Sequence, residues 1–447
     1  MGNILVYVRP WNSNQLLDLA QLTWPNYNIL RISEHKGFDD VGYIKEYYEN
    51  IDRIDRTCDF ERSAPFKDVE IDDIIIRCRL LRALDFEFAK RLVHSAIQAI
   101  ERVLENVQPK YILSVTVDSY IIDLLARLAK KRAIKFIGLV PTFVDGYFRI
   151  TERGEKAINR KVDPQEVEAV VSMLTKQEYK PQWLAANRKV IKKKAIRLWA
   201  RNLIKPAWFF FYSRLKRDPL NAHYMTTDIV SRKYLSLFPK LYNEFDNIDS
   251  VFSVISEDSR RSIFLPLQMS PEATIDYWSS DKSWIDYENK IISVVKEYSD
   301  RYIFIVKEHP NVYGFRAPDF YGRLLENKNV ILVNPEVSSN GLLEICDSVL
   351  VCTGTVGFEA LLRGKPVMST SEPFYAPIEE FLDLDDDLIQ SPENDPRRLV
   401  EYLLSGFSPG VFINDGSWNN NAHSDARFNK LVSHSITGIL SDCENEA

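Results

Sequence analysis

A repeated order of short apolar segment, turn and amphipathic helix is the feature that most constrains the fold. Residues 111–115 (YILSV) predict a buried strand, residues 121–133 (IIDLLARLAKKRA) predict a helix, and residues 135–140 predict a second strand. Strand, helix and strand at this spacing form a βαβ unit, which requires a parallel sheet covered by helices. An earlier strand is predicted over 3–8, and two helices over about 68–107.

The same order returns in the second half of the chain. Helical segments separate five predicted strands there, at 262–267, 302–307, 330–333, 348–352 and 366–369.

We therefore predict an α/β protein with two Rossmann-like domains that face a central cleft. The expected parts are an N-terminal domain over 1–155, a helical basic insertion over 156–245, a C-terminal domain over 246–425, and a C-terminal helix and tail over 426–447.

Composition excludes several classes of protein. The 447 residues are 45% hydrophobic and 27% charged, which is ordinary for a globular chain and argues against disorder or collagen. The five cysteines are never spaced as CxxC, so they predict reduced thiols rather than a zinc site or a disulfide framework. We find no signal-peptide pattern and no apolar run of about 18 residues, so we expect a cytoplasmic protein without a spanning segment.

The positive charge is concentrated in one segment. Residues 179–217 contain 12 Lys or Arg and no acid, although the whole chain has 57 basic and 63 acidic residues. Pro206 is expected to end a helix there, and an aromatic group at 208–212 (WFFFY) follows it. A cationic helix with aromatics predicts contact with an anionic membrane surface through about 183–217. The alternative is a helix packed on its own domain; without a recognised binding module, nucleic acid is not expected.

Ligands of open α/β sheets bind at the carboxyl ends of strands, so the residues after each strand form the candidate site. His309, between Glu308 and Pro310, follows the strand 302–307. Its imidazole can donate to a phosphate or give a proton to a leaving group. The alternative is a histidine that only holds its own loop.

A loop rich in Thr and Gly follows the strand 348–352. The hydroxyls of Thr353 and Thr355, the small Gly354 and Gly357, and a helix N-terminus predict a phosphate cradle without GxGxxG or Walker spacing. The alternative is a threonine that only caps the helix. Glu359 in the first helical turn either binds a ribose hydroxyl or complements the helix dipole.

Polar residues follow three further predicted strands. Gln268 and Glu272 come after 262–267, where they either face the cleft or form a capped turn. Asp118 and Asp145 follow the strands at 111–115 and 135–140, and each suits a general base or a nucleophile. Asp118 can instead cap a helix, and Asp145 can instead belong to a turn before a glycine. Arg149 can hold an anionic sugar group or tune Asp145.

These motifs resemble the capsular polysaccharide biosynthesis family that includes the bacterial β-Kdo transferases. An acid followed by Gly, an aromatic and Arg corresponds to residues 145–149, and a strand-end Gln corresponds to Gln268. The His-Pro block corresponds to residues 307–316 (KEHPNVYGFR), and a Thr-rich turn before Glu-Ala-Leu corresponds to residues 353–361.

The resemblance implies a GT-B fold and a glycosyltransferase that uses a nucleotide-activated sugar, commonly a CMP sugar such as CMP-Kdo, with neither metal nor other cofactor. It implies that His309 and the loop 353–357 hold the nucleotide phosphate, while Lys307 and Arg316 add positive charge or are simply solvated. Asp145 or Asp118 is then the base of an inverting reaction or the nucleophile of a retaining one. The acceptor is a glycan or a lipid-linked glycan of capsule, O-antigen or lipopolysaccharide, reached at the inner face of the cytoplasmic membrane.

Two other functions stay open. A CDP-glycerol-type glycerophosphotransferase would use His309 as the base, and a non-catalytic protein would bind a nucleotide sugar or a glycan without turnover. An acidic run at Asp383 and 385–387 is expected to be a solvated loop rather than a metal site.

Overall fold

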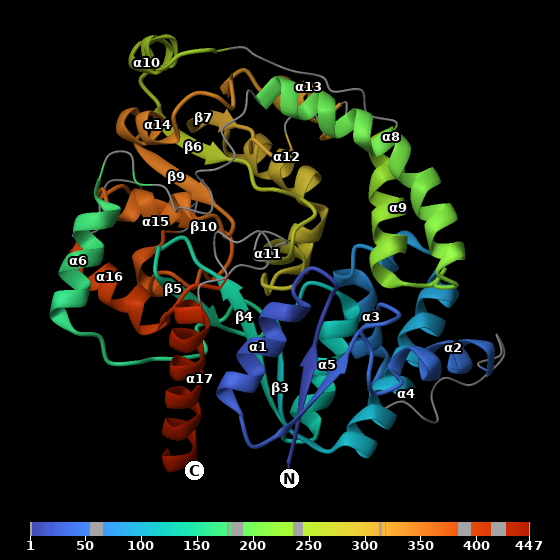
Figure 1. Ribbon diagram of the computed structural model, residues 1–447. Coiled ribbons are helices and arrows are strands. Elements are labelled where there is room, and N and C mark those ends of the chain that lie inside the picture. Colours follow the sequence, from blue (N-terminus) through green and yellow to red (C-terminus); the bar gives the residue numbers. More distant parts are fainter. Residues whose placement is uncertain are drawn as a thin grey trace. The chain divides into compact units, whose positions relative to one another are not determined.

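The computed structural model shows two compact α/β units (Figure 1). The first unit comprises residues 1–160, 207–229 and 405–447, and the second comprises residues 161–206 and 230–404. The structure describes residues 2–53, 66–176, 179, 191–235, 245–312, 315–317, 319–382, 395–412 and 426–446.

A six-stranded sheet in the order β11-β5-β4-β3-β1-β2 forms the centre of the first unit. β1 to β4 are parallel, whereas β5 and β11 add antiparallel at one edge. β1 and β3 are buried because helices cover them, which explains their nearly continuous apolar sequences. The strands are β1 (Asn3–Tyr7), β2 (Asn28–Ile32), β3 (Pro109–Val115), β4 (Lys135–Pro141), β5 (Tyr147–Ile150) and β11 (Ser408–Pro409).

The helices of the first unit pack in two groups. α1 packs on β1 to β3 and on the C-terminal helix α17, whereas α2 and α5 both pack on the long helix α4. The side chain of Asp85 accepts a hydrogen bond from the Phe88 N–H and starts α4, and Gln108 ends it in the left-handed conformation. The helices are α1 (Ser13–Thr23), α2 (Tyr43–Arg53), α3 (Asp68–Arg77), α4 (Phe86–Val107), α5 (Tyr120–Lys131) and α17 (Ala426–Glu446).

A five-stranded parallel sheet in the order β10-β9-β6-β7-β8 forms the centre of the second unit. Its strands are β6 (Arg261–Pro266), β7 (Tyr302–Lys307), β8 (Val330–Val333), β9 (Ser348–Val351) and β10 (Val367–Ser369). Its helices are α6 (Pro164–Leu174), α10 (Ile248–Ser256), α11 (Ala273–Asp276), α12 (Tyr287–Tyr298), α13 (Phe320–Leu325), α14 (Ser339–Ile345), α15 (Val356–Leu361) and α16 (Pro396–Ser405).

The prediction of two α/β domains is therefore confirmed, and all predicted strands occur within one or two residues of their expected bounds. The expectation that Pro206 ends a helix is wrong. α8 (Ile191–Leu215) continues through Pro206, which lies on the buried face of the helix and removes only one backbone donor. α9 (Ala222–Leu235) follows it.

The middle of the chain does not form a compact unit of its own. Residues 161–206 belong to the second unit and residues 207–229 to the first, where Tyr48 Oη donates to Asp218 and the Asn221 amide donates to the Glu34 carbonyl oxygen. The C-terminal helix belongs to the first unit, because α17 packs on α1.

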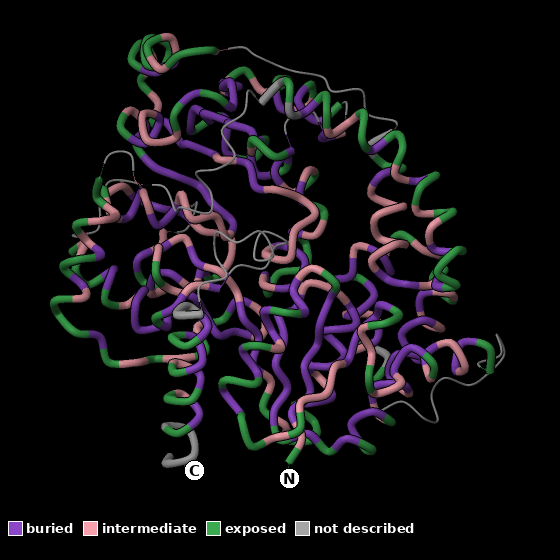
Figure 2. Tube along the Cα trace, in the orientation of Figure 1, coloured by how far each residue is buried: buried purple, intermediate pink, exposed green. Residues whose placement is uncertain are grey.

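Burial follows the two sheets. Figure 2 shows their strands as mostly buried tube, and the outer faces of α8 and α17 as largely exposed. Among the described residues, no helix combines the length and the apolar character that a membrane crossing needs.

Candidate functional site

The carboxyl ends of β6 and β9 are joined by one amide side chain. Gln268 Nε2 donates to Thr353 Oγ1 at 2.7 Å, and the Thr353 N–H donates to Gln268 Oε1 at 2.9 Å. Because β9, β6 and β7 are neighbours in the sheet, the loops that carry Thr353, Gln268 and His309 leave it at the same edge. The structure therefore brings together three of the residues predicted to hold the nucleotide.

A buried ion pair stabilises the loops at this edge. Arg316 Nη2 donates to Glu308 Oε1 at 2.9 Å and to the Gln268 carbonyl oxygen at 2.6 Å, and Tyr321 Oη donates to Glu308 Oε2 at 2.7 Å. Burial acts to lower the pKa of Arg316, but the Glu308 carboxylate outweighs it and raises that pKa. Arg316 thus ties the end of β7 to the end of β6, and the alternative that it is simply solvated is wrong.

The side chains of Lys307 and His309 form hydrogen bonds with neighbouring protein groups. Lys307 Nζ donates to Ser339 Oγ at 2.7 Å, which fixes the end of β7 to the start of α14. His309 is half-buried, and its Nδ1 accepts from the Asn311 N–H at 3.2 Å. A neutral imidazole that accepts at Nδ1 carries its proton at Nε2, so His309 can donate from that atom. Pro310 is exposed, and residues 313 and 314 of the same motif lie outside the described residues.

The loop after β9 combines packing with open backbone donors. Within the described part of the chain, the Gly354 and Thr355 N–H groups donate to no protein acceptor, and Tyr375 Oη donates to the Gly354 carbonyl oxygen at 3.0 Å. A Cβ on Gly357 would lie 2.4 Å from Tyr375 Oη, so protein packing rather than a ligand requires that glycine. Thr355 occupies the N-cap position of α15 without a side-chain cap, which removes the capping alternative for its hydroxyl.

Glu272 follows β6, and Glu359 follows β9. Glu272 Oε2 accepts from Thr274 Oγ1 at 3.0 Å, a local contact that fits the alternative of a polar turn. Glu359 is half-buried in the first turn of α15. The acidic run at 383 and 385–387 lies outside the described residues.

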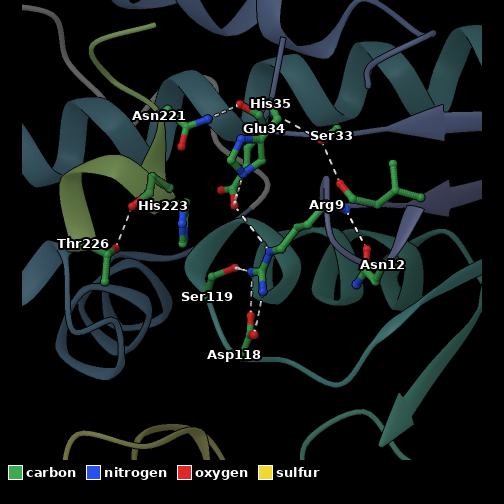
Figure 3. A network of polar contacts seen from close by, with 12 residues as sticks. Arg9, Asn12, Ser33, Glu34, His35, Asp118, Ser119, Asn221, His223 and Thr226 are labelled. Carbon is green, nitrogen blue, oxygen red and sulfur yellow. Dashed lines mark hydrogen bonds and ion pairs between the residues drawn. The ribbon is translucent and has the colours of Figure 1, made fainter. Parts of the chain in front are cut away.

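In the first unit, Asp118 is paired with an arginine. Arg9 Nη1 and Nη2 donate to Asp118 Oδ2 and Oδ1, both at 2.7 Å, and Arg9 Nη2 also donates to Ser119 Oγ at 3.2 Å (Figure 3). Burial acts to raise the pKa of Asp118, but Arg9 outweighs it and holds that pKa below its usual range. Ser119, not Asp118, is the N-cap residue of α5, so the capping alternative is wrong.

Asp145 and Arg149 separate in the structure. Asp145 is half-buried in the turn between β4 and β5, before Gly146 with φ +87°, so it does belong to the predicted turn. Arg149 is buried and donates from Nη2 to the carbonyl oxygens of Gly154 and Glu155, at 2.6 and 3.1 Å. Burial lowers the pKa of Arg149 to about 9. These contacts hold the backbone after β5, and they replace the expected role of Arg149 in binding an anionic sugar.

Sequence reasoning missed two residues that complete the edge of the first sheet. Arg9 follows β1 and Glu34 follows β2, and Figure 3 shows the Arg9 guanidinium between Glu34 and Asp118. Arg9 Nε lies 3.4 Å from Glu34 Oε1. Burial raises the pKa of Glu34. The strand-end rule could have found Arg9, because its strand was predicted; β2 was not predicted, so no signal pointed to Glu34.

The two parallel-rich sheets and their strand-end sites define an α/β protein built from two Rossmann-like units. Residues 126–379 match the model of the capsule polysaccharide biosynthesis protein family, and the chain belongs to this family.

Individual relatives are distant. The chain is 25% identical over 173 residues to the capsule polysaccharide modification protein LipA of Neisseria meningitidis serogroup A; the match covers 37% of this chain and about a quarter (24%) of the relative. Among solved structures, the chain is similar to the β-Kdo 2,7-transferase of Thermosulfurimonas dismutans KpsC, with 14% identity, a TM-score of 0.39 and coverage of 92% and 94%. It is also similar to the UDP-GlcNAc 2-epimerase of Methanocaldococcus jannaschii, with 13% identity, a TM-score of 0.24 and coverage of 90% and 98%.

Proposed function

We propose that this protein is a GT-B glycosyltransferase that transfers a sugar from a nucleotide-activated donor, of the CMP type, during assembly of a bacterial surface polysaccharide. Membership of the capsule polysaccharide biosynthesis family supports the pathway. The observation that carries the donor site is the edge of the second sheet, where Gln268 fixes the Thr353 loop and the loop of His309 leaves the sheet at the same edge.

The chemistry of that edge suits a diphosphate or monophosphate group. The Gly354 and Thr355 N–H groups and the His309 Nε2 proton are donors that can neutralise a phosphate as the sugar leaves. We assign to the buried Glu308–Arg316 pair the role of keeping these loops in place. Among the described residues, no group of three His, Cys, Asp or Glu gathers as a metal site would need.

On the acceptor side, Asp145 is the carboxylate that we assign as base or nucleophile. Asp118 is the weaker proton acceptor, because Arg9 holds it ionised through two short hydrogen bonds. Asp145 lies in the turn after β4 and belongs to the acid-Gly-aromatic-x-Arg motif of the family resemblance.

Nucleotide binding tests the donor site. We expect CMP, rather than CDP, UDP or GDP, to raise the melting temperature of the protein, and His309→Ala to abolish both that shift and sugar transfer from CMP-Kdo. His434→Ala is the matched control, because His434 is exposed on α17. A UDP or GDP preference would change the donor, turnover of CDP-glycerol would identify a glycerophosphotransferase, and an unaffected His309→Ala enzyme would contradict the site.

We also propose that the protein docks on an anionic membrane surface through α8. The inner face of α8 carries buried residues at helical spacing, Ala195, Asn202, Pro206 and Ser213. The opposite face, which Figure 2 shows as largely exposed, presents large apolar side chains to solvent: Ile204 is 69% exposed, Trp208 62%, Phe211 70% and Leu215 80%.

Basic residues beside this face favour an anionic partner. Lys193, Arg197, Arg201, Arg214 and Lys216 are exposed on the same helix or directly after it. Apolar groups between basic groups, with aromatics among them, match the interface of a bilayer rich in anionic lipid. Docking would bring the enzyme to an acceptor that is linked to a membrane lipid. The first part of the predicted segment, residues 183–190, lies outside the described residues.

Vesicle flotation tests the docking surface. We expect the protein to float with vesicles that contain phosphatidylglycerol and not with phosphatidylcholine alone. Changing Trp208, Phe211 and Leu215 to Ser should weaken partitioning by more than about tenfold, since each buried apolar side chain contributes roughly 1.5–3 kcal/mol.

The control carries the same three changes at exposed apolar residues outside α8, Leu22, Phe86 and Leu431. Equal loss in both variants, or no binding by the unchanged protein at low salt, would contradict docking through α8.

A further inference from the structure

A polar cavity lies within the first unit, and Asp118 is the residue of the predicted site that lines it. Its volume is about 140 Å3, roughly ten times the ~10–15 Å3 that one water needs. Arg9 and Asp118 line it from the ends of β1 and β3, and His223 and Thr226 line it from α9. The cavity is therefore large enough for a ring-sized group rather than for a single water.

The lining offers both hydrogen-bond donors and acceptors. Arg79 and Ser119 join Arg9 as donors, and the carboxylates of Asp118 and Glu34 are acceptors. Arg9 is already committed through two short bonds to Asp118, which keeps this pair charged and fixed in place. Glu34 is 5% exposed and lines both this cavity and a much smaller one of about 10 Å3.

The balance of charge decides between classes of ligand. An anionic group would lie beside the carboxylates of Asp118 and Glu34, and a cationic group would lie beside the guanidinium groups of Arg9 and Arg79. Neutral hydroxyl groups avoid both conflicts, because each hydroxyl can accept from a guanidinium and donate to a carboxylate at the same time.

The wall formed by α9 adds an apolar surface to these polar groups. The His223 ring lines the cavity and is held by the Trp11 ring, with centroids 4.9 Å apart, and by the Phe209 ring at 6.3 Å (the view of Figure 3 includes His223). A planar ring beside fixed acids and arginines suits the face of a pyranose, which is apolar over its C–H groups and polar at its rim.

We propose that this cavity binds one neutral sugar residue through its hydroxyl groups, with Asp118, Glu34 and Arg79 as the polar partners and His223 against the ring. That the sugar belongs to the acceptor is an assignment that rests on the proposed function. Arg9 is a positioning residue here, because it holds Asp118 through both of its oxygens.

Two neighbouring threonines on α9 provide a matched test. Thr226 lines the cavity and its hydroxyl donates to the Ala222 carbonyl oxygen, whereas Thr227 lies outside the lining and its hydroxyl donates to the His223 carbonyl oxygen. Both are half-buried. Thr226→Phe fills the cavity without removing any of the charged groups, and Thr227→Phe adds the same ring elsewhere on the same helix.

The experiment is saturation-transfer NMR on the full chain with the methyl glycosides of glucose, galactose, mannose, N-acetylglucosamine and N-acetylgalactosamine. We expect at least one glycoside to bind the unchanged protein and Thr227→Phe, and to bind Thr226→Phe at least about tenfold more weakly, or 1.4 kcal/mol. Absence of binding to all five glycosides, or equal loss in both variants, would overturn the sugar site.

A second readout separates this site from the donor site. The thermal shift with CMP should be the same in both Phe variants as in the unchanged protein, because the cavity and the Thr353 loop belong to different units. Sugar binding without any nucleotide shift would leave the cavity standing and contradict the proposed transferase. A thermal shift with CMP but no sugar binding would support the donor site and contradict the sugar site.

Discussion

Glu308 is contacted by three donors, two of them side chains and one a backbone N–H. Its carboxylate accepts from Arg316, from Tyr321 Oη at 2.7 Å and from the His309 N–H at 2.6 Å. Both members of the ion pair are nearly inaccessible to solvent, with side chains 4% and 1% exposed. Removing one charge leaves the other buried without compensation, which is the costly case for buried pairs.

We therefore predict that Glu308→Gln lowers the free energy of unfolding by about 3 kcal/mol, because Arg316 keeps its charge and loses its counter-charge. Urea denaturation measures this change. Glu372→Gln is the control, since Glu372 is exposed in the same unit. A loss no larger than that of the control would show that the pair does not stabilise these loops.

Strand-end residues were predictable from the sequence, but their roles were less so. Alternation of strand and helix identifies His309, Gln268 and Thr353, and the structure does place their loops at one edge. Arg149 and Arg316 carry the same sequence signal, yet both are buried against partners in their own unit. Whether an arginine faces a ligand depends on how the turn beside it folds, because Arg149 donates to carbonyl oxygens five and six residues later, and Arg316 donates to a carboxylate eight residues earlier.

At the scale of the element, α15 shows how a short helix is fitted to the sheet. Gly357 lies in its first turn, where a Cβ would come within 2.4 Å of Tyr375 Oη and 2.9 Å of Val351 Cγ2. Gly354, three residues earlier, has room, because a Cβ there would meet only the Gln268 side chain at 3.8 Å or more.

This difference predicts opposite outcomes for two Gly→Ala changes. Gly357→Ala should cost about 1–3 kcal/mol of stability through overpacking, whereas Gly354→Ala should leave stability nearly unchanged. Thermal denaturation of the two variants in parallel measures the effect. Similar stability of both variants would contradict the close approach of Tyr375 to α15.

Some elements could not be read from the sequence for a physical reason. β2 is a five-residue strand with mixed exposure at the edge of its sheet, and β5 has four residues, so neither gives a long apolar run. α8 contains Pro206, which local propensity treats as a stop. The buried face of the helix continues on both sides of it, from Ala195 to Ser213, and tertiary packing outweighs the local preference.

At the scale of the whole molecule, the basic segment is divided between the two units rather than forming a third. The rest of the chain is acidic, so the net charge of −6 is the sum of a basic helix and two acidic α/β units. Local donors at the strand ends, rather than overall charge, therefore make the proposed phosphate site.

Acid should destabilise the first unit through His35. Burial, with His223 and Arg9 nearby, lowers the pKa of this imidazole from 6.5 to about 3. Between these pH values the folded state binds fewer protons than the unfolded state. The contribution of His35 to the free energy of unfolding is therefore fully present above pH 6.5 and is lost as the pH falls toward 3. Lowering the pH from 7.5 to 5 should cost about 2 kcal/mol through this residue alone.

His35→Phe keeps a ring among its aromatic neighbours Trp11 and Tyr224 but cannot be protonated. We expect this variant to lose about 2 kcal/mol less stability than the unchanged protein over the same pH change, by urea denaturation at each pH. His434→Phe, at an exposed position of α17, should keep the full acid sensitivity. An unchanged acid loss in His35→Phe would mean that other groups account for it, and that the His35 imidazole can be protonated where it lies.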